Sequence, residues 1–335
     1  MYINDNLKIK LNGDIIKKYP HIKKLYAGGN CGINDDSLVG LNLVELNARG
    51  NSKIKKINHM TNLRILDASC NYRIYDENLF GLNCGIDDDS LVGLNLVKLN
   101  ARGNSKIKKI NHMTNLRILN ASGDCRIDHE NLIGLNCGID DDSLVGLNLV
   151  KLNASWNPKI KKINHMTNLR ILDAGGTCGI KDDNLNGLNL VELNAGDNAK
   201  IKKINHMINL RILNASWNCG INDDSLVGLN LVELNAHNNS KIKKINHMTN
   251  LRILYAYLNS GINDDSLVGL NLEELNAYNN PKIKKVNHMT NLKILHAGWK
   301  CGIGDEDLVG LNLIKLYANN NPKIQKNIST LDEWD

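Results

Sequence analysis

The chain has 335 residues, a formal net charge of +6 at pH 7, 4% aromatic residues and a single Phe. So few aromatic side chains exclude an ordinary globular core and predict an interior of Leu, Ile, Val and Ala. The start of the chain lacks the basic and apolar regions of a signal peptide, and no apolar run approaches the ~20 residues of a membrane span. We therefore expect an intracellular, cytoplasmic protein without a membrane segment.

Nearly the whole chain is a repeat with two parts. One part reads L-V-x-L-N-A-x-x-N-x-K-I-K-K-I-N-H-M-T-N, as in residues 231–250, and the other reads L-R-I-L-x-A-x-x-x-C-G-I-x-D-D-S-L-V-G-L-N, as in 210–230. From Leu149 to Leu313 the first part recurs every 41 residues. Such a period predicts a solenoid. We expect about 14 coils over residues 22–324, an N-terminal cap over 1–21 and a C-terminal cap over 325–335.

Each coil opens with L-x-x-L-x-A, which predicts a short strand and the turn beyond it. Leu231, Leu234 and Ala236 would point inward, and the residues between them outward. Asn239, three residues after the Ala, can satisfy main-chain groups at a buried bend with its amide. Asp223–Ser225 precede Leu226, which suggests a capped helical turn on an otherwise irregular return.

Two steps near the N-terminus are longer than the rest. Leu43 to Leu96 and Leu96 to Leu149 are each 53 residues apart, and the surplus is assigned to residues 84–95 and 137–148, which both read C-G-I-D-D-D-S-L-V-G-L-N. An enlarged connection on the back of the solenoid is the favoured interpretation. The alternative is an additional short strand over Leu79–Cys84.

The repeated L-x-x-L-x-A-x-x-N pattern resembles the leucine-rich repeat family, and the Cys-Gly-Ile units resemble its cysteine-containing subclass. The resemblance implies an α/β repeat solenoid: an arc with a parallel β-sheet on its concave face and irregular, 3-10 or short helical returns on its convex face. It also implies that the concave sheet binds a partner. The chain departs from most members by having Ala at the third inward position of the strand.

The cysteines recur at one place in the repeat. Equivalent atoms two coils apart would be about 9–10 Å from each other, whereas a disulfide needs Cα atoms within about 7 Å. We therefore expect reduced, buried packing residues, which suit a reducing compartment. The residues concerned are Cys31, Cys125, Cys178, Cys219 and Cys301.

No catalytic or metal site is expected. A histidine recurs within N-H-M, but equivalent imidazoles two coils apart are too distant to share one metal ion, so a surface or capping role is predicted. Ser225 and Ser266 recur in the D-D-S turn, where helix capping explains them, and a catalytic triad would not be copied in every repeat. We expect no enzyme activity and no cofactor. The histidines are His59, His112, His165, His206, His247 and His288.

Charged residues alternate along the repeat. Lys241, Lys243 and Lys244 would lie in a layer next to Asp223 and Asp224, which predicts interleaved ion pairs and interrupts any continuous basic track. Nucleic acid is therefore an unlikely partner. Cross-strand ion pairs are also expected between an arginine column and a glutamate column. These columns are Arg64, Arg117, Arg170, Arg211 and Arg252, and Glu192, Glu233 and Glu274.

The residues that differ between repeats surround the inward Ala and are rich in aromatic side chains. Exposed Trp and Tyr often anchor protein interfaces, so we predict a protein-binding patch on the concave face. Drift at tolerant positions is the competing explanation. Single-stranded nucleic-acid binding by stacked rings and a structural array without a fixed ligand are the alternative functions. The predicted patch comprises Trp156, Trp217, His237, Tyr255, Tyr257, Tyr278, His296, Trp299 and Tyr317.

Overall fold

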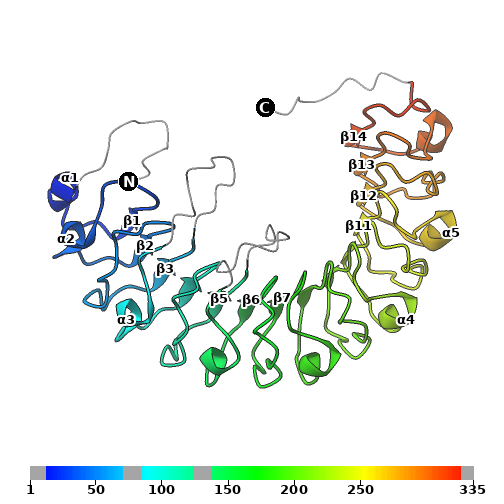
Figure 1. Cartoon of the computed structure of the whole chain (residues 1–335). Coiled ribbons are helices and arrows are strands. Elements are labelled where there is room, and N and C mark those ends of the chain that lie inside the picture. Colours follow the sequence, from blue (N-terminus) through cyan, green and yellow to red (C-terminus); the bar gives the residue numbers. More distant parts are fainter. Residues whose placement is uncertain (1–12, 71–83, 124–136, 326–335) are drawn as a thin grey trace, which may run out of the picture. The chain divides into compact units, whose positions relative to one another are not determined.

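The computed structural model describes residues 13–70, 84–123 and 137–325. The chain divides into two compact units, Met1–Leu169 with Thr177–Gly179 and Arg170–Gly176 with Ile180–Asp335, which we name unit 1 and unit 2. In each unit the strands lie side by side, and the short helices lie across the coil from them (Figure 1). The predicted solenoid of short strands and mostly irregular returns is therefore confirmed.

Unit 1 begins with a short helix and contains parallel strands paired in sequence order. The helix α1 (Gly13–Lys17) falls within the predicted N-terminal cap. The strands are β1 (Lys24–Tyr26), β2 (Glu45–Asn47), β3 (Ile65–Asp67), β4 (Lys98–Asn100), β5 (Ile118–Asn120) and β6 (Lys151–Asn153). Helical turns on the returns are α2 (Asp35–Leu38), α3 (Asp88–Leu91) and the 3-10 turn η1 (Asp142–Leu144).

Unit 2 repeats the same arrangement, again with parallel strands in sequence order. Its strands are β7 (Ile171–Asp173), β8 (Glu192–Asn194), β9 (Ile212–Asn214), β10 (Glu233–Asn235), β11 (Ile253–Tyr255), β12 (Glu274–Asn276), β13 (Ile294–His296) and β14 (Lys315–Tyr317). Its helical turns are η2 (Asp182–Leu185), α4 (Asp223–Leu226), α5 (Asp264–Leu267) and η3 (Asp305–Leu308).

The core is a stack of apolar layers of two alternating kinds. Leu234 of β10 lies in register between Leu213 of β9 and Leu254 of β11. Leu234 and Ala236 are fully buried, as the L-x-x-L-x-A pattern predicts. Ile242 and Ile245 fill the return side of the same coil and are also fully buried. Each coil therefore covers the apolar layer of its neighbours, and one coil alone could not bury its own layer.

A buried asparagine closes the bend after each strand of the first repeat type. Asn239 donates from Nδ2 to the carbonyls of Ala215, 2.7 Å away, and Ile221, 3.2 Å away. Its Oδ1 accepts from the main-chain N–H of Lys241 at 3.1 Å. The predicted structural role is confirmed, because the amide satisfies three main-chain groups that the core would otherwise leave without partners. The same bonds to the Ala and Ile carbonyls recur at Asn51, Asn104, Asn157, Asn198, Asn280 and Asn321.

The predicted helical turn forms on alternate returns and is capped at its start. At α4 the Asn222 side chain accepts from the main-chain N–H of Ser225 at 3.1 Å, while Ser225 Oγ accepts from the N–H of Asn222 at 3.0 Å. The cap is thus Asn222, one residue before the D-D-S group, and Ser225 completes a reciprocal capping box. Among the described residues, no helix has the length and apolar character needed to cross a membrane.

The segments 84–95 and 137–148 require a correction. Cys84–Asn95 forms an ordinary return: Gly85 N donates to Asn51 O at 2.9 Å, and α3 follows with its capping box. Cys137–Asn148 does the same, with Gly138 N donating to Asn104 O at 3.0 Å. Residues 84–95 and 137–148 are therefore ordinary parts of their coils and not enlarged connections.

The preceding stretches, 71–83 and 124–136, lie outside the described residues, and so does most of the proposed strand Leu79–Cys84. Among the described residues, β3 pairs directly with β4, and β5 pairs directly with β6.

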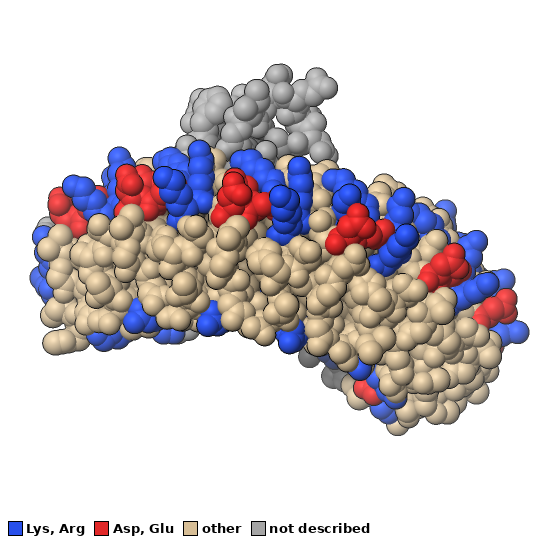
Figure 2. Space-filling model, turned by 90° about the horizontal axis from the view of Figure 1, so that it is seen from below, with Lys and Arg blue, Asp and Glu red and all other residues tan. Residues whose placement is uncertain are grey.

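Acidic and basic side chains alternate along one border of the side seen in Figure 2, as the repeat predicts. The contacts differ from the expected ion pairs. Asp223 Oδ1 accepts from the main-chain N–H of Lys243 at 2.6 Å and of Lys244 at 2.8 Å. Lys241 Nζ donates to the carbonyl of Cys219. The aspartate and the lysine ammonium therefore bind main-chain groups of neighbouring coils, because an irregular return leaves those groups without ladder partners.

Candidate functional site

The sheet face of unit 2 carries most of the predicted patch. The sheet face of unit 2 is defined here by the first and third residues of strands β7–β14, together with the two residues that follow each inward Ala. The middle residue of each strand is turned into the core, so its neighbours on both sides reach the surface. Eight of the nine predicted residues lie on this face; Trp156 has the same place in its coil but belongs to unit 1.

The second residue after the inward Ala has a left-handed backbone. Its φ is 58° at Trp156, Trp217 and Trp299, and 56° at Leu258. Bulky residues rarely adopt this conformation, because Cβ approaches a carbonyl oxygen at a cost of about 1–2 kcal/mol. Most other coils have smaller residues there: Gly29, Gly50, Gly103, Gly176, Asp197, Asn238, Asn279 and Asn320. Three of the four tryptophans thus occupy positions that the fold would fill more easily with Gly or Asn.

Two of these tryptophans, Trp217 and Trp299, are also exposed. Trp217 keeps 49% of its surface accessible and Trp299 keeps 48%, although Trp is usually well buried. His237 differs from the other predicted residues because it is buried, at 8% exposure. Partial exposure is shared by Tyr255, Tyr257, Tyr278, His296 and Tyr317.

His237 joins two of the rings. Its imidazole stacks on Tyr257, with centroids 4.3 Å apart and planes 4° apart. Trp217 packs edge-on against the same imidazole, at 5.4 Å and 81°. His237 Nδ1 lies 2.8 Å from Asn235 Oδ1, which fixes the ring, and burial lowers the pKa of His237. The imidazole therefore lies between the coils of Trp217 and Tyr257 and contacts both rings, and these two rings present the accessible surface.

A second group of rings lies further along the sheet face. Tyr278 and Trp299 contact at 6.4 Å with planes inclined by 58°, and His296 stacks on Tyr317 at 4.3 Å. Gly298 leaves room for this arrangement, since a Cβ there would lie 3.1 Å from Cδ2 of Tyr278. The rings meet across neighbouring coils because strand spacing suits aromatic contact.

Carboxylates line the start of the same strands, and sequence reasoning had assigned them only to ion pairs. Burial raises the pKa of Glu233, and the negative charges of Glu274 and Glu192 add to it. Tyr255 donates a hydrogen bond to Glu274; burial first, and then this carboxylate, raises the pKa of Tyr255 to about 12. The recurring Glu in L-V-E-L was the signal for this column. Tyr26, 46% exposed at the third position of β1 in unit 1, was also missed.

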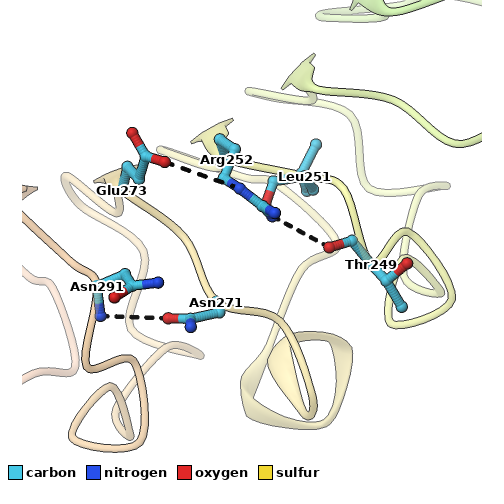
Figure 3. Close-up of polar contacts among 6 residues, drawn as sticks. All are labelled: Thr249, Leu251, Arg252, Asn271, Glu273 and Asn291. Carbon is cyan, nitrogen blue, oxygen red and sulfur yellow. Dashed lines mark hydrogen bonds and ion pairs between the residues drawn. The ribbon is translucent and has the colours of Figure 1, made fainter.

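Arg64, Arg117, Arg211 and Arg252 of the arginine column have a structural role, and the ion pair of Arg252 differs from the expected one. Arg252 Nη1 donates to the carbonyls of Thr249 and Leu251, each 3.0 Å away (Figure 3). Its Nε lies 3.7 Å from Glu273, not from the predicted Glu274. Arg64, Arg117 and Arg211 cap the equivalent carbonyls. Arginine is therefore a main-chain cap before alternate strands.

The recurring histidines also contact the main chain. His247 Nε2 lies 3.2 Å from Leu226 O, at the end of α4, and His288 Nε2 lies 3.3 Å from Leu267 O. His112 and His165 repeat this contact with Leu91 and Leu144. The predicted capping role is confirmed for these four. Within the described ranges, no three His, Cys, Asp or Glu residues are grouped to hold a metal ion.

The buried thiols are poorly suited to nucleophilic chemistry. Burial raises the pKa of Cys84 and Cys137 to about 12, and that of Cys219 and Cys301 to about 11. A nucleophilic cysteine needs the opposite shift, because the thiolate is the reactive form. Cys178 is buried as well, Cys31 is half-buried, and Cys125 lies outside the described residues. The predicted packing role is confirmed for the buried members.

The coils define a class of fold. Short parallel strands with the L-x-x-L-x-A pattern, a buried Asn after alternate strands and a capped turn on the return make the chain a leucine-rich repeat solenoid. No protein-family model matches the chain, and no curated protein matches it.

Several solved structures resemble the chain. An internalin from Listeria monocytogenes is 16% identical, with TM-score 0.49, over 85% of this chain and 88% of that one. A leucine-rich repeat protein from Leptospira interrogans is 14% identical, with TM-score 0.44, over 95% of this chain and 82% of that one. A chain in the crystal structure of the Rad7 and Elc1 complex in yeast is 14% identical, with TM-score 0.47, over 95% of this chain and 85% of that one. No statement about a ligand follows from these likenesses.

Proposed function

We propose that the chain is a non-catalytic protein-interaction scaffold, and that a protein partner binds the sheet face of unit 2. One observation carries the proposal: Trp217 and Trp299 are half exposed on a left-handed backbone. Neither burial nor backbone preference accounts for Trp there, since Gly or Asn would be less strained. Local strain of this kind is concentrated at functional sites in proteins.

The neighbouring rings support the same proposal. Tyr257 is held by the buried His237, and Tyr278 contacts Trp299. Preordered aromatic side chains lose little conformational entropy when a partner binds, and Trp and Tyr are prominent among the residues that dominate interface energetics. Random drift would not favour rings that contact one another across coils.

Single-stranded nucleic acid is the second candidate, because bases stack on Trp and Tyr. Its phosphates would have to lie beside Glu192, Glu233 and Glu274, and the guanidinium of Arg252 is bound to carbonyls. The charges of this face therefore favour a protein. A repeat array without a fixed ligand is the third candidate, and it would not explain why two tryptophans are exposed.

Affinity capture from the native cell tests the proposal. The wild type is compared with the triple variant Trp217→Ala, Tyr257→Ala, Trp299→Ala, and Trp156→Ala serves as the control at the same coil position in unit 1. Circular dichroism and Tm establish that each variant is folded. We expect the triple variant to lose a partner that the control retains. Unchanged recovery by a folded triple variant would contradict the proposal. Steep loss of a bound oligonucleotide with added salt would favour the second candidate.

The compartment is also a proposal. Cys84, Cys137, Cys219 and Cys301 carry thiols that lie inside the coils, which supports a reducing environment such as the cytoplasm. Imaging of the tagged full-length chain in its native cell tests this expectation.

A further inference from the structure

The first residue of the strands of the first repeat type differs in charge along the chain. In unit 1 it is Glu45 in β2, Lys98 in β4 and Lys151 in β6. In unit 2 three consecutive strands of this type carry Glu192, Glu233 and Glu274, in β8, β10 and β12, and β14 carries Lys315. The repeat is otherwise nearly identical, so backbone requirements do not explain this exchange of charge.

The residue after the inward Ala follows the same division. Unit 1 has Arg49 and Arg102 there, whereas the corresponding residues of unit 2 include His237, Tyr257 and Tyr278 and contain neither Lys nor Arg. Unit 2 therefore combines carboxylates with the electron-rich faces of aromatic rings on one surface. The coil of β4 in unit 1 combines Lys98 with Arg102.

The carboxylate of Glu233 lies near two other carboxylates of the same face. The groups that act on Glu233 are Glu274 and Glu192, and both disfavour its charge. The guanidinium of Arg252 is turned to the carbonyls of Thr249 and Leu251 and toward Glu273 (Figure 3). Glu274 accepts a hydrogen bond from Tyr255, which is neutral. A cation placed beside these strands would therefore relieve repulsion that the free protein retains.

We propose that the sheet face of unit 2 recognises a basic segment of a protein partner, with Arg or Lys side chains lying between the carboxylates and the rings. This inference rests on the proposed function and names the chemistry of the partner. Ring faces attract cations within about 6 Å, most strongly when water is excluded, and carboxylates select the same charge. Glu192, Glu233 and Glu274 supply selectivity, while Trp217, Tyr257 and Trp299 supply contact area.

A defined peptide tests the inference with the full chain. Fluorescence anisotropy follows a labelled peptide of alternating Arg and Ser, an equally long peptide of alternating Glu and Ser, and labelled oligo(dT). We expect the Arg peptide alone to bind, with an affinity that falls as salt is added. Binding of the Glu peptide or of oligo(dT) in preference to the Arg peptide would overturn the inference.

Matched variants test whether the Arg peptide binds at the sheet face of unit 2. Glu233→Lys with Glu274→Lys introduces the residue that β4, β6 and β14 have at this position. We expect this variant to bind the Arg peptide at least about tenfold more weakly, because like charges then face each other. Asp224→Lys with Asp265→Lys makes the same change of charge on the exposed turns α4 and α5 and should have a much smaller effect. Glu233→Gln with Glu274→Gln provides the test if the Lys variant does not fold. If the Glu and Asp variants lost the same affinity for the Arg peptide, binding would reflect the overall charge of the protein, and the inference would be overturned.

The two proposals fail in different ways. If the triple aromatic variant loses its native partner while the Glu variants still bind the Arg peptide normally, the binding face stands and the basic partner is wrong. If the folded triple variant keeps both its native partner and the Arg peptide, the proposed function itself fails, and this inference fails with it.

Discussion

His237 stacks on Tyr257 with ring centroids 4.3 Å apart and planes 4° apart, so a buried imidazole fixes an accessible phenol on the neighbouring coil. Asn235 holds the imidazole from the other side at 2.8 Å. This pair links the core of unit 2 to the face on which we propose that a partner binds. Disturbing the imidazole should therefore change both stability and the exposed rings.

Acidification should weaken unit 2. Burial lowers the pKa of His237, so as pH falls below about 6.5 the unfolded chain takes up the proton first and the free energy of unfolding decreases. We expect the Tm to fall between pH 7.5 and pH 5, with less fall in His237→Gln. His296, whose pKa burial also lowers, leaves a remaining dependence that a second His296→Gln change should reduce. Identical pH profiles for wild type and His237→Gln would contradict the prediction.

Trp217→Asn should separate stability from binding. Asn suits the left-handed backbone, as Asn238 and Asn279 show, but the substitution loses the contact with His237. These effects oppose each other, so the free energy of unfolding should stay within about 1 kcal/mol of wild type. Partner recovery should nevertheless fall. Urea denaturation measures the first quantity and affinity capture the second.

The core variant Leu234→Ala provides a calibration for that experiment. This substitution should lower the free energy of unfolding by roughly 2–5 kcal/mol, because it creates a cavity in a fully buried layer. A loss of the same size in Trp217→Asn would show that Trp217 is a packing residue and would remove the main support for the proposed site.

Asn280→Ala should be strongly destabilising. Asn280 donates to Ala256 O at 2.7 Å and Ile262 O at 3.2 Å, and accepts from Lys282 N at 3.1 Å. Its removal leaves buried main-chain groups without partners, which we expect to cost roughly 2–5 kcal/mol. Asn259, also three residues after an inward Ala but exposed, is the matched control. Asn259→Ala should change the free energy of unfolding by less than about 0.5 kcal/mol.

The buried thiols should resist labelling in the native protein. Because burial raises the pKa of Cys84 and Cys137 to about 12, very little thiolate is present near neutral pH. Alkylation followed by peptide mass mapping should find both residues unmodified natively and modified in urea. Rapid native alkylation of Cys84, with Cys137 unmodified, would show that its coil opens locally.

Much of the coil could be predicted from the sequence, because its determinants are local and repeated. The positions of Leu231, Leu234 and Ala236 follow from alternation along one strand, and the role of Asn239 follows from amide chemistry at a bend. The predicted contacts that were wrong involve neighbouring coils. Asp223 binds the main chain of Lys243 and Lys244, and Arg252 lies near Glu273 and not Glu274.

The candidate site was found in part by the same reasoning. Variation between otherwise identical repeats identified Trp217 and Trp299 as candidate site residues. This step required no knowledge of which residues are in contact. The left-handed backbone beneath them was not predicted, although Gly50, Gly103 and Asn238 at the same place were a signal for it. Nor did the pattern show that His237 would be buried and stacked on Tyr257 of the neighbouring coil.

The sequence by itself determined the repeating coil, its inward layer and the positions where side chains could vary, because a fixed period forces each coil to bury the same residues. Only the tertiary structure decided which of the varied side chains meet. Strands stacked in register bring residues about 20 positions apart to ring-contact distance, as His237 and Tyr257 show. It also decided that carboxylates from alternate strands share one face with those rings, since their mutual repulsion exists only once the coils are stacked.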